Sequence, residues 1–232
     1  MYYIVSFFYG EKMKRCFLFD FDGTIVDSLS YWYRSSRECL ESFGVSVEQG
    51  FEKSITNMTY EKLSQIYLAK YGIKKTALEI ALIENKLMEK HYRNDVKVKN
   101  GIINLIKQIE EINGKIAIIT YTKGSMVNEY LERKKIRDKF DVVVSAIDEG
   151  LSKDDETIYL NVLNKLNETP SSSCYFDDSL INIKTVNKIG IDTIAVYDEM
   201  NSGNWNALKA ESNYTIKSFC DYSSIEELLV SK

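Results

Sequence analysis

The sequence is poor in proline, histidine and long apolar runs, and each shortage argues against a class of function. Pro170 and His91 are the only residues of their types among the 232. A single histidine, set among charged residues of an expected helix, weakens any Ser–His or Cys–His catalytic mechanism. No apolar run approaches the ~20 residues that a membrane-spanning helix needs. We therefore expect no membrane partner.

Excess charge of one sign and paired cysteines are also lacking. The 30 basic and 34 acidic residues leave a net charge of −4, and no basic face dominates, so we expect no nucleic-acid partner. The four cysteines show no CxxC spacing, which favours reduced thiols in a cytoplasmic protein. Residues 1–12 are apolar but lack a basic region and a cleavage site, which argues against a signal peptide. They fit either a short edge strand or an upstream start.

Short apolar segments alternate with amphipathic segments over most of the chain. The short segments are rich in β-branched and aromatic residues and apolar on both faces, which is typical of fully buried strands. Their alternation with helical patterns predicts an α/β fold: a Rossmann-like parallel sheet with helices on both faces. The predicted strands lie near 15–21 and at 115–120, 140–145, 173–177 and 192–197, and the predicted helices at 102–112, 124–135, 155–167 and 179–189.

One interval breaks this alternation. Between Asp27 and about Asp95 no convincing strand is visible, while helical spacing recurs and glycines mark the turns. We therefore predict a core made of residues 1–26 and 96–232, interrupted by an all-helical domain at residues 27–95. Its predicted helices cover 31–43, 60–71 and 77–92.

The ends of the predicted strands carry the polar residues. Ligands of open parallel sheets bind outside the carboxyl ends of the strands. There the sequence places four carboxylates, a hydroxyl group and a lysine: Asp20, Asp22, Thr120, Lys153, Asp177 and Asp178. Clustered carboxylates need a cation, and a set of oxygen ligands suits Mg²⁺. Mg²⁺ together with a lysine and a hydroxyl suits a phosphoryl group, which a carboxylate can attack.

Four segments, in order, resemble the motifs of the haloacid dehalogenase-like superfamily, specifically its phosphatases. They are DFDGTIVDS, IAIIT, LSKDDETIY and YFDDSLINI, and the resemblance spans residues 16–190. The helical insertion resembles the cap of the subgroup that contains phosphoglycolate phosphatases and β-phosphoglucomutases. The resemblance implies a Mg²⁺-dependent phosphatase that acts on a small phosphorylated metabolite through an aspartyl-phosphate intermediate. We expect a monomer or a homodimer.

The resemblance also implies roles for four catalytic residues. Asp20 corresponds to the nucleophile, which is also a Mg²⁺ ligand. Asp22 corresponds to the general acid and base, and its main-chain carbonyl would bind Mg²⁺. Thr120 corresponds to the hydroxyl that binds the phosphoryl group. Lys153 corresponds to the residue that neutralises nucleophile and phosphate together.

The remaining metal ligand implied by the resemblance is Asp178, with Asp177 beside it. The chain departs from the family pattern at two nearby places. Many members carry a second acid where this chain has Asn182, which adds no charge. Members often carry Lys-Pro-x-Pro where this chain has Lys-Asp-Asp-Glu at 153–156, so the lysine loop lacks the prolines that shape it.

Alternatives remain open at this point. A phosphomutase similar to β-phosphoglucomutase would share every motif, and a non-catalytic phosphate-binding regulatory relative would keep the fold. A haloacid dehalogenase generally lacks the second aspartate, so Asp22 argues against it. A phosphonate-cleaving member would need a lysine of the cap that forms a Schiff base, and no lysine there has a context that selects it. The sequence leaves the substrate undetermined.

Overall fold

The structure is a computed structural model. It describes residues 14–48, 50, 51, 55, 60–221 and 223–229. Residues 1–12, predicted as an edge strand or an upstream start, lie outside the described residues. Among the described helices, none combines the length and the apolar character that crossing a membrane requires. The chain divides into two compact units, residues 1–25 with 99–232 and residues 26–98.

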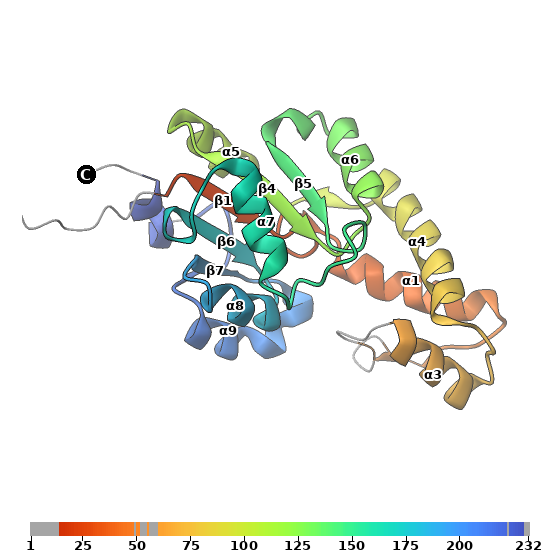
Figure 1. The fold of residues 1–232 in the computed structure, drawn as a ribbon. Coiled ribbons are helices and arrows are strands. Elements are labelled where there is room, and N and C mark those ends of the chain that lie inside the picture. Colours follow the sequence, from red (N-terminus) through yellow and green to blue (C-terminus); the bar gives the residue numbers. More distant parts are fainter. Residues whose placement is uncertain (1–13, 49, 52–54, 56–59, 222, 230–232) are drawn as a thin grey trace, which may run out of the picture. The chain divides into compact units, whose positions relative to one another are not determined.

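The first unit is built on a six-stranded parallel sheet with the order β5-β4-β1-β6-β7-β8. In Figure 1 the strands β1, β4 and β6 run side by side through its middle. The strands cover Cys16–Phe19 (β1), Lys115–Thr120 (β4), Val142–Ser145 (β5), Ser173–Asp177 (β6), Asp192–Val196 (β7) and Tyr214–Ile216 (β8). Every residue of β1 and β6 is buried, which fits the apolar sequence of β1 and the apolar middle of β6.

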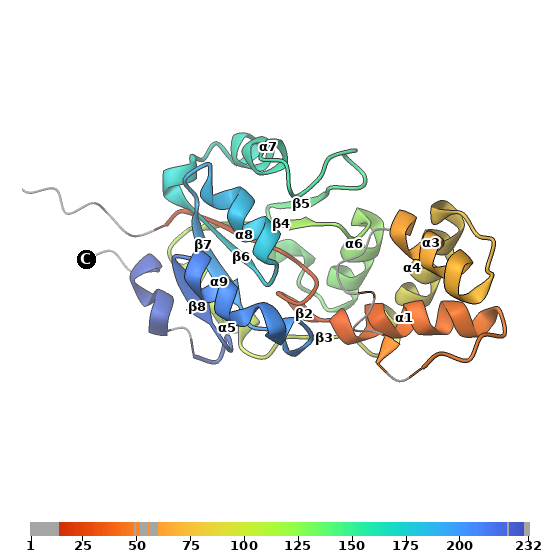
Figure 2. The ribbon, with the colours of Figure 1, turned by 90° about the horizontal axis from the view of Figure 1, so that it is seen from below.

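Helices cover the sheet on both faces. They are α5 (Ile102–Glu111), α6 (Gly124–Arg133), α7 (Thr157–Leu166), α8 (Leu180–Asn187) and α9 (Trp205–Glu211). Cys16 and Leu18 of β1 pack in one cluster with Tyr159 and Val162 of α7. The alternate residue Phe17 faces Ile109 of α5, and both lie within 3.0 Å of a Cβ built on Gly114. Figure 2 shows α7 and α8 on one side of the sheet and α5 on the other.

The five predicted strands and four predicted helices of the core are confirmed, with shifts of a few residues at their ends. The prediction missed β8 and α9. Strand β8 has only three residues, which is too short to show a period, and α9 has only seven. A 3₁₀ turn at Glu199–Asn204 joins β7 to α9, and it contributes to the site described below.

The second unit contains α1 (Leu29–Ser42), α3 (Tyr60–Tyr71) and α4 (Ala77–Asn94). Its apolar cluster includes Leu40, Tyr67 and Ile80, one from each helix. A two-stranded antiparallel ribbon, β2 (Val26–Asp27) with β3 (Lys97–Val98), joins its two ends. The sequence did not reveal this ribbon, because two residues per strand carry no pattern. The predicted domain limits of 27–95 stay a prediction.

Candidate active site

The sheet topology explains why residues far apart in sequence meet. Strand β1 pairs with β4 on one side and with β6 on the other, and all three strands point the same way. Asp20 directly follows β1, Thr120 is the last residue of β4, and Asp177 is the last residue of β6. Three of the strand ends selected from the sequence therefore lie next to one another at one edge of the sheet.

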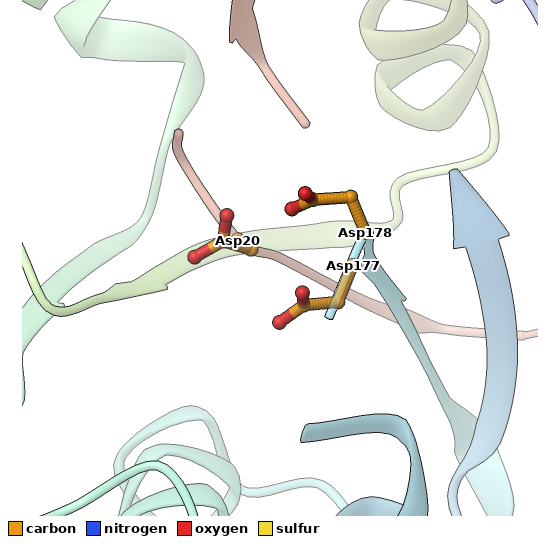
Figure 3. A group of neighbouring side chains, drawn as sticks. All are labelled: Asp20, Asp177 and Asp178. Carbon is orange, nitrogen blue, oxygen red and sulfur yellow. The ribbon is translucent and has the colours of Figure 1, made fainter. Parts of the chain in front are cut away.

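Three buried carboxylates converge at this edge. Each of Asp20, Asp177 and Asp178 offers a carboxylate oxygen, and these oxygens lie within 4.8 Å of one another. Figure 3 shows the Asp20 side chain beside the two side chains from the end of β6. Carboxylates at this distance repel one another strongly when they are buried. The arrangement therefore requires positive charge.

Lys153 supplies part of that charge. Its side chain is 1% exposed, and its Nζ atom donates to Asp20 Oδ1 at 2.5 Å and to Asp177 Oδ2 at 3.0 Å. Burial opposes the charge on the ammonium, but the Asp177 and Asp20 carboxylates outweigh burial and raise the pKa of Lys153 above its ordinary value. The lysine is therefore charged and joins the ends of β1 and β6.

One ammonium does not balance three carboxylates. Burial and the neighbouring Asp177 carboxylate together outweigh the ammonium of Lys153 and raise the pKa of Asp20 to about 8. Burial and the neighbouring Asp177 also raise the pKa of Asp178 well above its usual range. With all three carboxylates ionised and Lys153 charged, the group would have a net charge of −2. A divalent cation would offset this charge and return these pKa values toward their ordinary range.

The Asp177 carboxylate accepts four hydrogen bonds, three of them on one oxygen. Its Oδ1 accepts from the Ser179 N–H at 2.7 Å. Its Oδ2 accepts from Lys153 Nζ, from Asn182 Nδ2 at 2.8 Å and from the Tyr175 hydroxyl. An ionised carboxylate offers about two acceptor positions on each oxygen, so Oδ2 is fully occupied and Oδ1 keeps one position. This pattern fits an anchor for Lys153 better than a metal ligand, and the prediction that Asp177 binds metal stays a prediction.

Asp178 is held differently. Its Oδ2 accepts from Asn201 Nδ2 of the 3₁₀ turn after β7. Gly23 adopts φ +78°, and a Cβ there would lie 2.9 Å from the Asp178 carboxylate, so this approach requires glycine. The Asn201 Oδ1 atom is buried without a hydrogen-bond partner. An oxygen-only donor set, a net negative charge and an unpartnered buried oxygen fit a hard divalent cation such as Mg²⁺.

A chain of two threonines links β4 to Asp22, which is partly buried. The Thr122 hydroxyl donates to Asp22 Oδ2 at 2.6 Å, and the Thr122 N–H donates to Thr120 Oγ1 at 2.9 Å. The Thr120 oxygen therefore accepts one bond, and its own proton can be donated to a ligand. Thr122 fixes the direction of the Asp22 carboxylate.

The structure brings together all six residues selected from the sequence: Asp20, Asp22, Thr120, Lys153, Asp177 and Asp178. Sequence reasoning missed the contact of Thr122 with Asp22 and the contact of Asn201 with Asp178. Asn201 lies beyond the end of β7, a strand end at which the sequence analysis placed no site residue. Applying the same strand-end rule there would have reached Asp198 and the turn that carries Asn201.

A model of the family described as haloacid dehalogenase-like hydrolase matches residues 17–196. The chain belongs to this family. The match begins at the strand that precedes Asp20 and ends at the last residue of β7, so it includes every site residue except Asn201. The hydrolase has both aspartates of the DxD segment and Lys153 within the matched residues.

Individual relatives agree with the family and the fold. The hydrolase is 24% identical over 187 residues to a phosphorylated carbohydrates phosphatase of Thermotoga maritima, covering 80% of this chain and 87% of that one. CbbY from Rhodobacter sphaeroides, crystallised in complex with xylulose-1,5-bisphosphate, superimposes with a TM-score of 0.78 at 18% identity, over 93% of this chain and 99% of that one. A β-phosphoglucomutase of Clostridium difficile superimposes with a TM-score of 0.71 at 22% identity, over 94% of this chain and 97% of that one.

Proposed function

We propose that this hydrolase is a Mg²⁺-dependent phosphatase that acts on a small phosphorylated metabolite, with Asp20 as its nucleophile. The observation that carries the proposal is the Asp20 carboxylate held between the Lys153 ammonium and the Asp178 carboxylate. The residues that would hold Mg²⁺ are Asp20, Asp178 and the main-chain carbonyl of Asp22. When bound, Mg²⁺ would neutralise charge on the nucleophile and on the phosphoryl oxygens.

The side chains support a two-step reaction. An oxygen of Asp20 attacks phosphorus, the bond from phosphorus to the leaving oxygen breaks, and Asp22 donates a proton to that oxygen. Asp22 then takes a proton from water, whose oxygen attacks phosphorus and releases the Asp20 carboxylate and inorganic phosphate. The Thr122 hydroxyl donates to Asp22 Oδ2 at 2.6 Å and would keep the Asp22 carboxyl group oriented during both proton transfers. Lys153 and Thr120 would stabilise the charge on the phosphoryl oxygens.

The proposed substrate class is a phosphorylated carbohydrate. One relative is named for phosphorylated carbohydrates, and another was crystallised with a sugar bisphosphate, which supports this class. The site residues of the core bind only the phosphoryl group and the cation in this account. Selection of the sugar would fall to the helical insertion at residues 27–95, which we propose acts as a cap that excludes bulk water.

The test is hydrolysis of p-nitrophenyl phosphate and of a panel of sugar phosphates, each with Mg²⁺ and with EDTA. We expect turnover with Mg²⁺ and none with EDTA. The Asp20→Asn variant should lose at least about 10³-fold in kcat, because its amide is a poor nucleophile. Asp138→Asn, which makes the same change at an exposed position, is the matched control and should keep wild-type turnover.

Two outcomes would change the assignment. Substantial Mg²⁺-dependent turnover by Asp20→Asn would contradict the role of Asp20. Conversion of one phosphosugar isomer into another without release of phosphate would assign the chain to phosphomutases, which need the same core groups. Release of phosphate should therefore be measured together with isomerisation of each sugar phosphate.

A further inference from the structure

The loop that carries Lys153 has to be held by something other than proline. Lys153 precedes α7 in the sequence Lys-Asp-Asp-Glu, and the one proline of the chain is Pro170. A lysine has a long flexible side chain, and fixing it costs conformational entropy. Yet the Lys153 side chain is 1% exposed and donates to two carboxylates. The main chain at Lys153 must therefore be fixed by contacts from outside the loop.

Two tyrosine hydroxyls hold the main chain of Lys153. Its N–H donates to the Tyr121 hydroxyl at 2.8 Å, and its carbonyl accepts from the Tyr159 hydroxyl at 2.8 Å. Tyr121 directly follows β4, and Tyr159 belongs to α7. Both polar groups of the Lys153 main chain are thus satisfied by side chains from two elements. Because they bind it from separate directions, the peptide planes on either side of Lys153 cannot turn freely.

The Tyr121 hydroxyl is itself oriented. Its oxygen lies 2.8 Å from Ser152 Oγ, and Ser152 Oγ donates to the Asp154 carboxylate. Since the Ser152 proton points to Asp154, the Ser152 oxygen accepts the proton of Tyr121. The Tyr121 oxygen is then left to accept from the Lys153 N–H. The loop residues on both sides of Lys153 therefore contribute to one continuous set of hydrogen bonds.

The tyrosine rings contact the charged end of the same lysine. Lys153 Nζ lies 5.8 Å from the ring centroid of Tyr121 and 5.7 Å from that of Tyr175, within the range of cation–π attraction. The Tyr175 hydroxyl donates to Asp177, the carboxylate that binds Lys153. The rings of Tyr159 and Tyr175 also pack edge to face, with their centroids 5.1 Å apart.

We propose that Tyr121, Tyr159 and Tyr175 form a tyrosine clamp that positions Lys153, in place of the loop prolines that this chain lacks. The three are positioning residues: they act on Lys153, and Lys153 acts on Asp20 and the phosphoryl group. The catalytic part of this inference rests on the proposed phosphatase function. Loosening the clamp lets the ammonium move away from Asp20, and small displacements of a catalytic group lower the rate strongly.

The test uses Tyr121→Phe in the full-length protein, with Tyr214→Phe as the matched control. Tyr121 is 44% exposed, so its loss should not prevent folding. Tyr121→Phe keeps the ring over Lys153 and removes the hydroxyl that accepts from the Lys153 N–H, together with its bond to Ser152. Tyr214→Phe likewise removes one hydroxyl, which donates to Glu227 at 2.8 Å. Tyr214 belongs to β8, and β6 and β7 lie between β8 and β1 in the sheet. Tyr159→Phe is a second variant, which removes the bond to the Lys153 carbonyl.

Two readouts separate the clamp from the phosphatase function. The first is hydrogen exchange of the Lys153 amide, measured by NMR without substrate. It should become about ten-fold faster in Tyr121→Phe and stay unchanged in Tyr214→Phe. The second is steady-state turnover of p-nitrophenyl phosphate with saturating Mg²⁺. We expect kcat to fall about ten-fold in Tyr121→Phe and in Tyr159→Phe, with KM within about two-fold and Tm as in the control.

The outcomes are distinct. Faster exchange with a lower kcat supports the clamp. Unchanged exchange of the Lys153 amide, or faster exchange with wild-type kcat, overturns it. If the wild type turns over no phosphomonoester while exchange still accelerates in Tyr121→Phe, the phosphatase proposal fails and the hold of the clamp on Lys153 is supported.

Discussion

The charge balance around Asp20 is decided by a few atoms. Lys153 Nζ contacts Asp20 and Asp177, and Asp178 has the Asn201 amide as its hydrogen-bond donor. Burying an ionised carboxylate without a positive partner costs free energy. Of the three carboxylates, Asp178 therefore depends most on a cation from solution for its ionised form. Removing a neutral neighbour of Asp178 should therefore change the affinity for the metal more than the chemistry.

The first residue-scale prediction concerns Asn201→Ala. The variant loses the hydrogen bond that orients Asp178, so the Mg²⁺ concentration for half-maximal activity should rise about ten-fold, while kcat at saturating Mg²⁺ stays within about two-fold. Mg²⁺ titration followed by calorimetry, without substrate, should show the same loss of affinity. Asn204→Ala, in the same 3₁₀ turn but exposed, is the control. Equal Mg²⁺ affinity in the two variants would contradict the role of Asn201.

A second residue-scale prediction concerns the contact between Thr122 and Asp22. Thr122→Val has nearly the same shape but cannot donate to Asp22 Oδ2, a bond of 2.6 Å in the wild type. Because Asp22 then loses its fixed direction, kcat should fall about ten-fold. Thr122→Ser restores the hydroxyl and should recover most of that loss. A kcat for Thr122→Val equal to that of Thr122→Ser would show that the hydroxyl does not orient Asp22.

Sequence patterns predicted the site residues because most of them lie at or just after the carboxyl end of a recognisable strand. A strand of four buried residues ends directly before Asp20, and a buried strand ends at Asp177. Because ligands of parallel sheets bind at the carboxyl ends of the strands, these positions were predicted to form the site. The same rule reaches Tyr121 and the turn that carries Asn201, but the contacts made by Tyr121, Tyr159 and Asn201 depend on where side chains of separate elements point. Strand β8 was missed because three residues show no period.

Helix α4 supports a prediction at the element scale, because it carries a buried carboxyl. Glu84 is 2% exposed and accepts from the Tyr67 hydroxyl of α3 at 3.1 Å. Burial raises the pKa of Glu84 to about 7, from an ordinary value of 4.5. The folded state therefore binds this proton more tightly than the unfolded state does. The contribution of Glu84 is fully present below about pH 4.5 and is lost as the pH rises toward 7.

Glu84→Gln should remove this dependence, because its neutral amide still accepts from Tyr67. The difference in free energy of unfolding between variant and wild type should grow in favour of the variant between pH 4.5 and 7, reaching of order 3 kcal/mol. Denaturant unfolding at a series of pH values measures it. Glu89→Gln, an exposed change on the same helix, should follow the wild type. A Glu84→Gln curve parallel to that of the wild type would exclude a buried titrating carboxyl.

At the scale of the whole molecule, the core and the helical insertion carry separate information. The core holds the acidic cluster, whereas the family match over residues 17–196 includes both the core and the insertion. The sequence sufficed to predict the α/β class and the insertion, since alternation and its interruption are visible over tens of residues. It did not predict the substrate, because substrate selection depends on the shape and polarity of side chains from several elements and follows no sequence period.

The central claim is that Asp20 carries the phosphoryl group during turnover. The most direct measurement is a rapid acid quench of the wild type with Mg²⁺ and a substrate it hydrolyses, followed by peptide mass spectrometry. The account predicts one added phosphoryl group on the peptide that contains Asp20, removed by hydroxylamine and absent from Asp20→Asn. A phosphoryl group found on any other residue, or turnover with a burst of product but unmodified Asp20, would contradict it.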